Sequence, residues 1–458
     1  MFIQQIYTAC LAQASYYIEC NGEAAVIDPI REPKPYLDIA ATRNARIKYV
    51  FETHFHADFV SGHLDLSDNT NAAIVFGPNA RPAYPAFIAK HNEKFLLGNC
   101  TIEVLHTPGH TIESCCYLLR DIHNNPQAIF TGDTLFVGDV GRPDLMSGNK
   151  SKTELGSMLY DSLNECIKTL PDSVTVYPGH GAGSACGKNL GVERYSTIGE
   201  QKHSNYALQP MSRNEFIAKV TDDLPTPPAY FFKDASINII GYKKLEDLLR
   251  QQMVALSVTE TLAARNEGAQ LLDTRKDSLF ARGFIPSSIQ IGLQGDFAPW
   301  AGCLLDIEKP IVVICESGSE KEVITRLARI GYENVLGYLE GGFEAWAETG
   351  HEIDHIPCIE AEEYSRYLDE GEYTAIDVRK KTETQIEHLE DTLQIPLSEF
   401  PKQAEHLDRN KRYLLFCKGG YRSMIAASLL KRQGILQIIN VNGGIKKIMA
   451  CRPALLTP

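Results

Sequence analysis

Short apolar runs recur through the first half of the chain, and each run ends in a turn. Runs of about four to eight apolar or β-branched residues between turn residues predict strands. The runs that end in turns rich in Gly, Pro, His or Asp occupy residues 47–54, 101–110, 115–119, 127–133 and 173–180. Two further runs, 16–20 and 24–29, flank Asn21 and Gly22, which predicts a β-hairpin.

Helical patterns lie between these strands, at residues 81–91 and 153–170. Strand runs interleaved with helices favour a mixed α/β fold, here an αββα sandwich. In such a sandwich, the turns that follow the strands should lie along one edge. A Pro-rich and aromatic segment, 224–234, closes this first domain, which we place at residues 1–240.

The second half of the chain alternates strand and helix patterns, which predicts parallel sheets built from βαβ units. The pattern also occurs twice. Three segments, 270–275, 310–318 and 331–346, have counterparts about 103 residues further on, at 374–379, 412–420 and 434–449. We therefore expect two similar α/β domains with parallel sheets, at residues 250–352 and 356–458.

Composition restricts the class of protein. The 458 residues are 44% hydrophobic and 22% charged, which is ordinary for globular domains. The net charge of −13 argues against nucleic acid as a partner. The first residues lack the basic start and apolar stretch of a signal peptide, and no apolar run approaches the ~18 residues of a membrane span. We expect a cytoplasmic protein with no membrane segment.

The 12 cysteines show no spacing typical of a disulfide framework or a zinc finger. We therefore expect free thiols in a reducing compartment. Most should be small buried hydrophobic residues, such as Cys10, Cys100 and Cys166. Three others have neighbours that indicate more, namely Cys186, Cys315 and Cys417.

Residues 53–63, THFHADFVSGH, carry the densest group of potential metal ligands. Two histidines and an aspartate alternate there behind an apolar run: His54, His56 and Asp58. Alternate side chains of a strand point the same way, so these groups should converge at its end. Three more candidates each occupy a turn after an apolar segment: His110, Asp133 and His180. The pattern predicts a metal site, but spacing alone leaves open which three of the six groups bind.

The order HxHxD, Gly-His, Gly-Asp and Pro-Gly-His resembles the metallo-β-lactamase fold superfamily, in its glyoxalase II-like branch. That branch places a His directly after the Asp, where it helps to hold a second metal. This chain has Phe59 there, and phenylalanine cannot bind a metal, so we expect one metal per chain. Together with GRPDL at 141–145 and GHGAGSACGK at 179–188, the motif resembles persulfide dioxygenases more closely.

This resemblance implies one Fe(II) bound by two histidines and an aspartate, the ligand pattern of non-haem iron oxygenases. The implied ligands are His54, His110 and Asp133. Three neighbouring groups would then orient ligands and water: His56, Asp58 and His180. The same ligands would also accept zinc or manganese.

Residues 417–423, CKGGYRS, follow a strand pattern and precede a helix pattern. Cys417 should therefore lie at a helix N-terminus among backbone N–H groups, beside Lys418 and Arg422, and all three features lower the pKa of a thiol. They would also stabilise a persulfide anion on Cys417. Both repeats resemble rhodanese domains, and Cys417 with Arg422 matches the active loop of that family. The resemblance implies that four loop residues bind substrate: Lys418, Gly419, Gly420 and Tyr421.

The middle domain departs from this pattern. Its loop reads CESGSEK, with Glu316 and Glu320 where the last domain has its two cations. Carboxylates raise the pKa of a nearby thiol and repel an anionic persulfide. We therefore expect Cys315 to be inactive and this domain to be a degenerate rhodanese that acts as a spacer or docking surface.

Two residues near the expected metal site have two interpretations each. Cys186 follows His180 in a Gly-rich loop, and it either reacts with the persulfide as a catalytic thiol or is the small residue that a tight loop requires. Arg142 either contacts the substrate or pairs with Asp144 to shape the pocket wall.

The domain order resembles bacterial fusions of a persulfide dioxygenase with rhodanese domains. It implies an enzyme of sulfide detoxification that uses O2 to oxidise a low-molecular-weight persulfide to sulfite. Sulfur transfer from Cys417 to sulfite would then give thiosulfate. The carrier could be glutathione, coenzyme A or another small thiol, and we expect a homo-oligomer.

Two other functions remain open. The first is a glyoxalase II-like thioester hydrolase with two zinc ions, against which Phe59 argues. The second is a sulfur-carrier docking protein in which the metal only stabilises structure. An open set of three ligands argues against this second function, because structural zinc sites are normally closed by four ligands.

Overall fold

The computed structural model describes residues 1–145, 150–224, 226–369, 371–451 and 456–457. It divides into two compact units. The first comprises Met1–Leu248 with Ala328–Gly331, and the second comprises Leu249–Leu327 and Tyr332–Pro458. Within the described part of the chain, no helix has both the length and the apolar character needed to cross a membrane.

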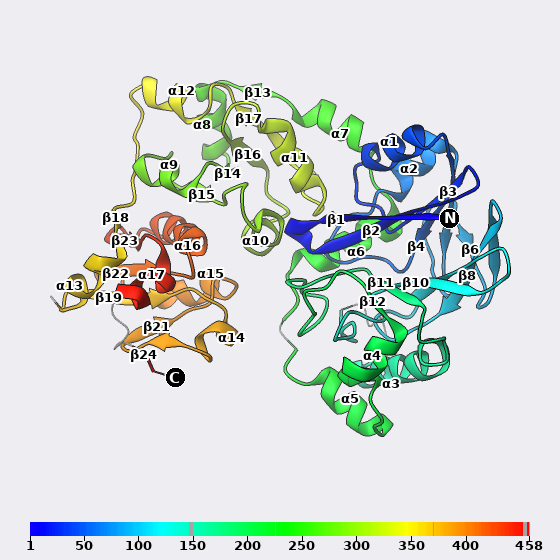
Figure 1. Cartoon of the computed structure of the whole chain (residues 1–458). Coiled ribbons are helices and arrows are strands. Elements are labelled where there is room, and N and C mark those ends of the chain that lie inside the picture. The colour runs from blue at the N-terminus through cyan, green and yellow to red at the C-terminus, as the bar shows by residue number, and fades with distance from the viewer. Residues whose placement is uncertain (146–149, 225, 370, 452–455, 458) are drawn as a thin grey trace. The chain divides into compact units, whose positions relative to one another are not determined.

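Two six-stranded sheets form the centre of the first unit (Figure 1). The first sheet contains, in order, β1 (Phe2–Thr8), β2 (Gln13–Cys20), β3 (Glu23–Ile27), β4 (Arg46–Glu52), β5 (Ala73–Phe76) and β6 (Phe87–Ile88). The second contains β7 (Lys94–Leu97), β8 (Cys100–His106), β9 (Cys115–Arg120), β10 (Pro126–Gly132), β11 (Thr175–Pro178) and β12 (Ser196–Thr197). The predicted hairpin is confirmed, since β2 and β3 pair antiparallel around Asn21 and Gly22, both with positive φ.

Alternation along the strands explains the layers of this unit. Tyr16 and Tyr117 point into a core between the two sheets. Their neighbours face outward: Tyr17 packs in a core with α1 (Lys34–Thr42) and α2 (His63–Thr70), and Leu118 packs in a core with α3 (Lys152–Ser162) and α5 (Arg213–Thr221). Figure 1 shows the four layers in sequence, so the predicted αββα sandwich is confirmed. The remaining helices of this part are α4 (Ile198–Ser204), α6 (Tyr230–Ile240) and α7 (Leu245–Gln252).

One predicted helix is wrong. Residues 81–91 form no helix, and they contain the short edge strand β6, which pairs with β5. Pro82 and Pro85 explain the difference, because each lacks a backbone N–H and disfavours the helical conformation in the residue before it. The helix predicted at 153–170 forms as α3, with a capping box between Ser151 and Glu154, and continues into a π-helical turn, Leu163–Ile167.

The expectation of free thiols is wrong for one pair. Cys20 ends β2 and Cys100 begins β8, and the two form a disulfide with their Cα atoms 6.1 Å apart. Both face the core between the sheets, where opposite strand ends bring them within bonding range. The sequence separation of 80 residues hides this pairing in the sequence. Cys10 and Cys166 are partly exposed rather than buried.

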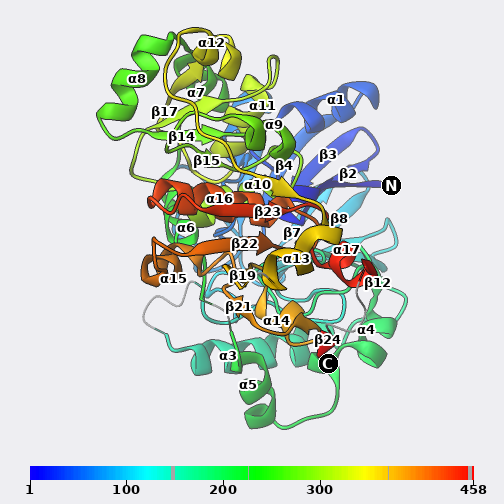
Figure 2. The ribbon, with the colours of Figure 1, turned by 90° about the vertical axis from the view of Figure 1, so that its left-hand side faces the viewer.

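The second unit contains two five-stranded sheets, each parallel throughout, as predicted. The middle sheet has the order β13 (Ala255–Leu256), β17 (Val335–Leu339), β16 (Ile311–Ile314), β14 (Gln270–Asp273) and β15 (Ile289–Gln290). The last has the order β18 (Cys358–Ile359), β23 (Ile438–Val441), β22 (Arg412–Phe416), β19 (Tyr373–Asp377) and β21 (Thr392–Gln394). Figure 2 shows β23, β22, β19 and β21 side by side.

Helices connect these parallel strands. In the middle sheet they are α8 (Val258–Asn266), α9 (Asp277–Arg282), α10 (Phe297–Leu304), α11 (Glu320–Ala328) and α12 (Gly342–Glu348). In the last they are α13 (Tyr364–Asp369), α14 (Lys381–Thr384), α15 (Phe400–Gln403), α16 (Tyr421–Arg432) and α17 (Gly444–Cys451). A small antiparallel pair adds β20 (His388–Leu389) and β24 (Leu456–Thr457).

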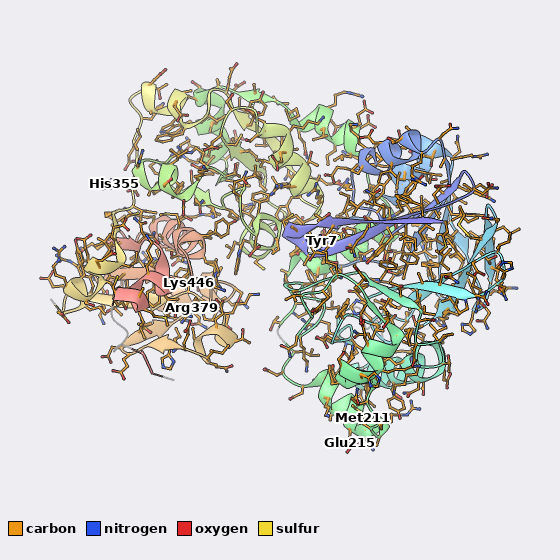
Figure 3. All side chains as sticks on the ribbon, in the orientation of Figure 1. Tyr7, Met211, Glu215, His355, Arg379 and Lys446 are labelled. Atoms are coloured by element: carbon orange, nitrogen blue, oxygen red, sulfur yellow. A yellow bond between two sulfur atoms is a disulfide. The ribbon has the colours of Figure 1, made fainter. Side chains whose placement is uncertain are left out.

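A buried ion pair marks the same place in both repeats. The Arg379 guanidinium, labelled in Figure 3, donates to both carboxylate oxygens of Asp377 at the end of β19 and to the carbonyl of Glu387. Arg275 makes the matching contacts with Asp273 and the carbonyl of Gly283. Each pair fixes the loop that follows its strand, because breaking it would leave an uncompensated buried charge.

We expect the core of the last domain to depend on β22. Replacing the fully buried Leu414 with Ala should lower the free energy of unfolding by about 2–5 kcal/mol, because it leaves a cavity. The control Leu393→Ala removes a side chain that is 43% exposed and should cost less than about 1 kcal/mol. Urea unfolding of the full chain measures both, and equal costs would contradict this account of the core.

Candidate metal centre and cysteine sites

The ends of four strands place the three expected metal ligands and His180 along one edge of the sandwich. His54 follows β4, Asp133 follows β10, His180 follows β11, and His110 lies in the turn after β8. Three of these groups face each other. Oδ2 of Asp133 lies 3.4 Å from Nε2 of His110 and 4.0 Å from Nε2 of His54.

Hydrogen bonds leave one nitrogen of each of these two histidines free for a metal. The hydroxyl of Thr53 donates to Asp28, so it accepts a hydrogen bond from Nδ1 of His54 at 3.0 Å. Nδ1 of His110 donates to the carbonyl of Arg142 at 2.9 Å. With both Nδ1 atoms protonated, both Nε2 atoms keep their lone pairs.

The charge states of this group also fit a metal. Burial lowers the pKa of His54 well below its usual value and lowers that of His110 as well, so both rings are neutral. Burial opposes ionisation of Asp133, but the charge and hydrogen bond of His180 outweigh it and hold the Asp133 pKa well below its usual range. Oδ2 of Asp133 is buried with no hydrogen-bond partner among the described residues. Two neutral imidazoles and one carboxylate therefore offer a three-donor site.

His180 has both ring nitrogens engaged. Nδ1 and Nε2 each lie 2.8 Å from a carboxylate oxygen, of Asp133 and Asp58 respectively. Burial lowers its pKa, but these two carboxylates raise it well above the usual value, so the ring is cationic. His180 thus fixes the orientation of Asp133 and neutralises it. A side chain at Gly179 would come within 2.7 Å of Oδ1 of Asp133, so this close approach needs glycine.

His56 lies in a separate buried group. Nε2 of His56 is 3.1 Å from Oδ1 of Asp28 and 3.6 Å from Oε2 of Glu52. Burial lowers the pKa of His56, but the Asp28 charge outweighs it and the pKa rises to about 9. Phe59, fully buried, packs its ring 4.4 Å from the His56 ring. The position of a second-metal histidine is therefore filled by an apolar ring.

Cys186 lies beside this centre. Its Sγ and the ligand atoms of Asp58 and His180 lie within 4.8 Å of one another. Burial, followed by the charges of Asp58 and Asp133, raises the pKa of the Cys186 thiol well above its usual value, so the group is a thiol rather than a thiolate. The structure thus brings Cys186 to the site but does not activate it as a nucleophile.

Arg142 is buried and supports the site through its backbone. Its guanidinium forms two hydrogen bonds with Asp144, its carbonyl accepts from His110, and its N–H donates to the carbonyl of Cys186. The pairing with Asp144 matches the second interpretation of this residue. Arg142 holds the His110 turn and the Cys186 loop together.

Sequence reasoning missed several supporting residues: Asp28, Glu52, Thr53 and Asp139. Asp28 follows the apolar run of β3 directly, and Thr53 precedes His54, so their position at a strand end is the signal that marks both. Asp139 accepts hydrogen bonds from the N–H groups of Lys188 and Asn189 and so holds the Cys186 loop. The hydrogen-bond partners of Asp139 are distant from it in the sequence, so no local motif indicated its role.

The Cys417 loop has the predicted form. Cys417 follows β22, and α16 begins at Tyr421. The N–H of Gly420 donates to Sγ of Cys417 at 3.1 Å, while Lys418 and Gly419 are exposed. Arg422 makes two hydrogen bonds with Glu383, a partner that the sequence did not indicate. The sulfur of Cys417 is therefore nearly inaccessible. A backbone N–H donates to it, and the positive charge of the nearby Arg422 is partly neutralised by Glu383.

The middle loop differs in charge. Burial raises the pKa of Cys315 to about 12, and the carboxylates of Glu320, Asp273 and Glu316 add to this effect. Glu320 itself accepts a hydrogen bond from the N–H of Gly318, so its carboxylate occupies the loop. Cys315 is therefore a poor nucleophile at neutral pH.

Comparisons with known proteins agree with this architecture. Residues 8–180 match the metallo-beta-lactamase superfamily model, and residues 257–349 and 360–451 match the rhodanese-like domain model. A crystal structure described as a metallo-beta-lactamase from Staphylococcus aureus is 33% identical with a TM-score of 0.66, and the match covers 74% of this chain and 98% of that one. The chain belongs to the metallo-β-lactamase superfamily and carries two rhodanese domains after its metal-site domain.

Two other proteins are similar over shorter spans. The crystal structure of ETHE1 from Myxococcus xanthus is 30% identical with a TM-score of 0.45, covering 52% of this chain and 98% of that one. A probable hydroxyacylglutathione hydrolase of Schizosaccharomyces pombe is 31% identical over 36% of this chain. The chain spans 62% of the length of that yeast protein. The metallo-β-lactamase and rhodanese domains of this chain are enzyme-like domains. The fold of the first, with its groups of His, Asp and Cys side chains, is suited to metal ions.

We expect loss of Asp133 to abolish metal binding and loss of Asp58 only to weaken it. The wild-type chain should bind one divalent ion, and Asp133→Ala should lose it because a direct ligand is removed. The matched control Asp58→Asn should keep one ion with about 10–100-fold lower affinity, since Asp58 acts through His180. Elemental analysis after dialysis measures the stoichiometry. Two ions in the wild type, or equal losses in both variants, would contradict the one-metal site.

We expect Cys315 to stay protonated well above neutral pH. Its alkylation by iodoacetamide should rise only in strongly alkaline buffer, because its pKa is raised to about 12. Glu320→Gln removes a negative charge and should shift the alkylation curve to lower pH, whereas the exposed Glu348→Gln should leave it unchanged. Peptide mass spectrometry across the pH range measures this, and an unshifted curve for Glu320→Gln would refute the role of Glu320.

Proposed function

We propose that this protein is a persulfide dioxygenase with one metal per chain, coupled to rhodanese sulfur transfer. One observation carries the proposal. Phe59 fills the position of a second-metal histidine, and both nitrogens of His180 are engaged with carboxylates. Among the described residues, this leaves the set of His54, His110 and Asp133 with its donor atoms unengaged and facing each other.

Two neutral imidazoles and a carboxylate, with positions left open, are the ligand pattern of non-haem Fe(II) oxygenases. Fe(II) held by His54, His110 and Asp133 would supply the activation of O2. The overall reaction converts R–S–SH, O2 and water into R–SH and sulfurous acid, which ionises to sulfite. The low dielectric of the buried site strengthens the contacts that His180 makes with Asp133, so the carboxylate stays in place throughout.

The last domain would complete the reaction by sulfur transfer. Sulfite attacks the outer sulfur of a Cys417 persulfide, a new S–S bond forms, and the bond to Sγ breaks. The products are thiosulfate and the Cys417 thiolate, and the loop N–H of Gly420 stabilises the negative charge on Sγ. Arg422 provides a cation close to the loop. Lys418, which is exposed, is placed to attract the sulfite anion.

The second candidate is a thioester hydrolase, and one observation favours it. Asp58, His180 and Cys186 form a second buried group near the first, which could hold another metal ion. The name of the yeast relative, a probable hydroxyacylglutathione hydrolase, points the same way. The engaged nitrogens of His180 argue against this function, because binding a metal would break its contact with Asp133 or Asp58.

We expect the iron-loaded protein to consume O2 when given glutathione persulfide and to form sulfite and thiosulfate. His54→Ala should abolish O2 uptake because it removes a ligand. Cys417→Ser should keep O2 uptake and sulfite but lose thiosulfate, because the sulfur-carrying thiol is gone. An oxygen electrode and ion chromatography measure these outcomes.

Two results would overturn the proposal. Thioester hydrolysis without O2 uptake would make the protein a hydrolase. Unchanged thiosulfate formation by Cys417→Ser would remove the transfer step. The small-molecule partners that we expect are a persulfide, O2 and sulfite. A cytoplasmic location and a homo-oligomeric assembly of the protein stay predictions.

A further inference from the structure

A cavity of about 270 Å³ lies within the second unit, beside the loop of Cys417. Its walls come mainly from the middle domain, and the last domain contributes Tyr421. The polar groups among its lining residues are Thr274, Lys276, Asp277, Gln294, Glu316 and Ser319. The cavity therefore joins the degenerate cysteine loop, which holds Glu316, to the active loop, which holds Tyr421.

Contacts between the two domains fix the active loop against this cavity. The hydroxyl of Tyr421 donates to the carbonyl of Gly292 at 2.8 Å. The Tyr421 ring lies so close to Gly295 that a side chain there would come within 2.5 Å of it. The N–H of Gln290 donates to Ser428 of α16 at 3.0 Å. The middle domain is thus packed on α16, the helix that follows the Cys417 loop.

One residue that lines the cavity, Asp277, also lies close to the loop around the sulfur. Oδ2 of Asp277 lies 3.7 Å from the place where a side chain of Gly420 would begin. The same Gly420 donates its N–H to Sγ of Cys417. Cys417 is only 1% exposed, so a slender group is what can approach it. A thiol ligand whose polar end is bound in the cavity would therefore place its sulfur close to the Cys417 loop.

Charge and size restrict the ligand. Lys276 offers an ammonium group, while Asp277 and Glu316 offer two carboxylates, so the lining is suited to a ligand that carries both signs. A polyphosphate carrier such as coenzyme A would meet two carboxylates and would exceed a volume of this size. An amino acid or short peptide thiol has an α-ammonium and an α-carboxylate group and fits both limits.

We propose that this cavity binds the head of a zwitterionic amino-acid or small-peptide thiol, whose persulfide donates sulfur to Cys417. Lys276 binds its α-carboxylate, and Glu316 with Asp277 binds its α-ammonium group. The middle domain thereby recognises the carrier for the last domain. This inference rests on the sulfur-transfer half of the proposed function.

Sulfur passes from the carrier to Cys417 in a single displacement. The Cys417 thiolate attacks the outer sulfur of R–S–SH, and a bond forms between Sγ and that sulfur. The original S–S bond breaks, and its electron pair leaves with R–S⁻. Cys417–S–SH and the carrier thiolate are the products, with no external oxidant or reductant.

The test measures sulfur loading of Cys417 in the full chain without O2, by quenching and peptide mass spectrometry. Cysteine persulfide and glutathione persulfide serve as carriers. Lys276→Ala and Glu316→Gln should each lower the second-order rate constant about tenfold, because each removes a charge-assisted contact. Controls outside the cavity, Lys309→Ala and Glu348→Gln, should match the wild type.

A carrier without the ammonium group separates recognition from structural damage. N-acetylcysteine persulfide should load the wild type about tenfold more slowly than cysteine persulfide. Glu316→Gln should cause no further loss with the acetylated carrier, because the contact is already absent. Equal losses with both carriers, or no loss in either variant, would overturn the proposed cavity site.

The assay also distinguishes this inference from the proposed function. If the wild type loads Cys417 but the cavity variants behave like it, only carrier recognition fails. If no persulfide loads Cys417 in the wild type, sulfur transfer itself fails, and the cavity proposal fails with it. Faster loading by coenzyme A persulfide than by the amino-acid carriers would also contradict the charge argument.

Discussion

The carboxylate of Asp133 is the group on which the first unit's site depends. One oxygen is fixed by His180, and the other faces two neutral histidines. This arrangement requires a buried cation, His180, next to a buried anion, and Asp58 completes the charge balance. Removing any member would leave a buried charge uncompensated. The positions of the ligands and the charge balance of Asp133, His180 and Asp58 therefore depend on each other.

The strand ends explain why these groups meet at all. β4, β10 and β11 end at the same edge, and glycines in the loops after β10 and β11 permit a close approach to Asp133. A side chain at Gly141 would lie 2.0 Å from the carbonyl of Asp133, which shows how closely the loops pack around the carboxylate. Close packing of the loop backbones therefore fixes the positions of the side chains at the site.

Much of this could be predicted from sequence, because the relevant patterns are local. Apolar periodicity located the sheets, the repeat revealed the tandem domains, and polar residues after strands identified the groups that converge. Long-range pairings escaped prediction: Cys20 with Cys100, Arg422 with Glu383, and Asp28 with Thr53. The helix expected at 81–91 does not form, because Pro82 and Pro85 disfavour the helical conformation. Which ligands bind a metal also depends on hydrogen bonds that spacing does not encode.

The two parallel sheets share one strand order, and their cysteine loops differ in charge. The shared order gives each copy a cysteine at the same strand end, so the backbone does not decide which copy reacts. Carboxylates lie beside the cysteine of one loop and cations lie beside the cysteine of the other, so the two thiols have different electrostatic surroundings. A domain whose cysteine does not carry sulfur can change its surface residues without loss of sulfur transfer. Under the proposal that the cavity of the middle domain binds the carrier, charge reversal in a duplicated domain gives one copy a recognition role for the other.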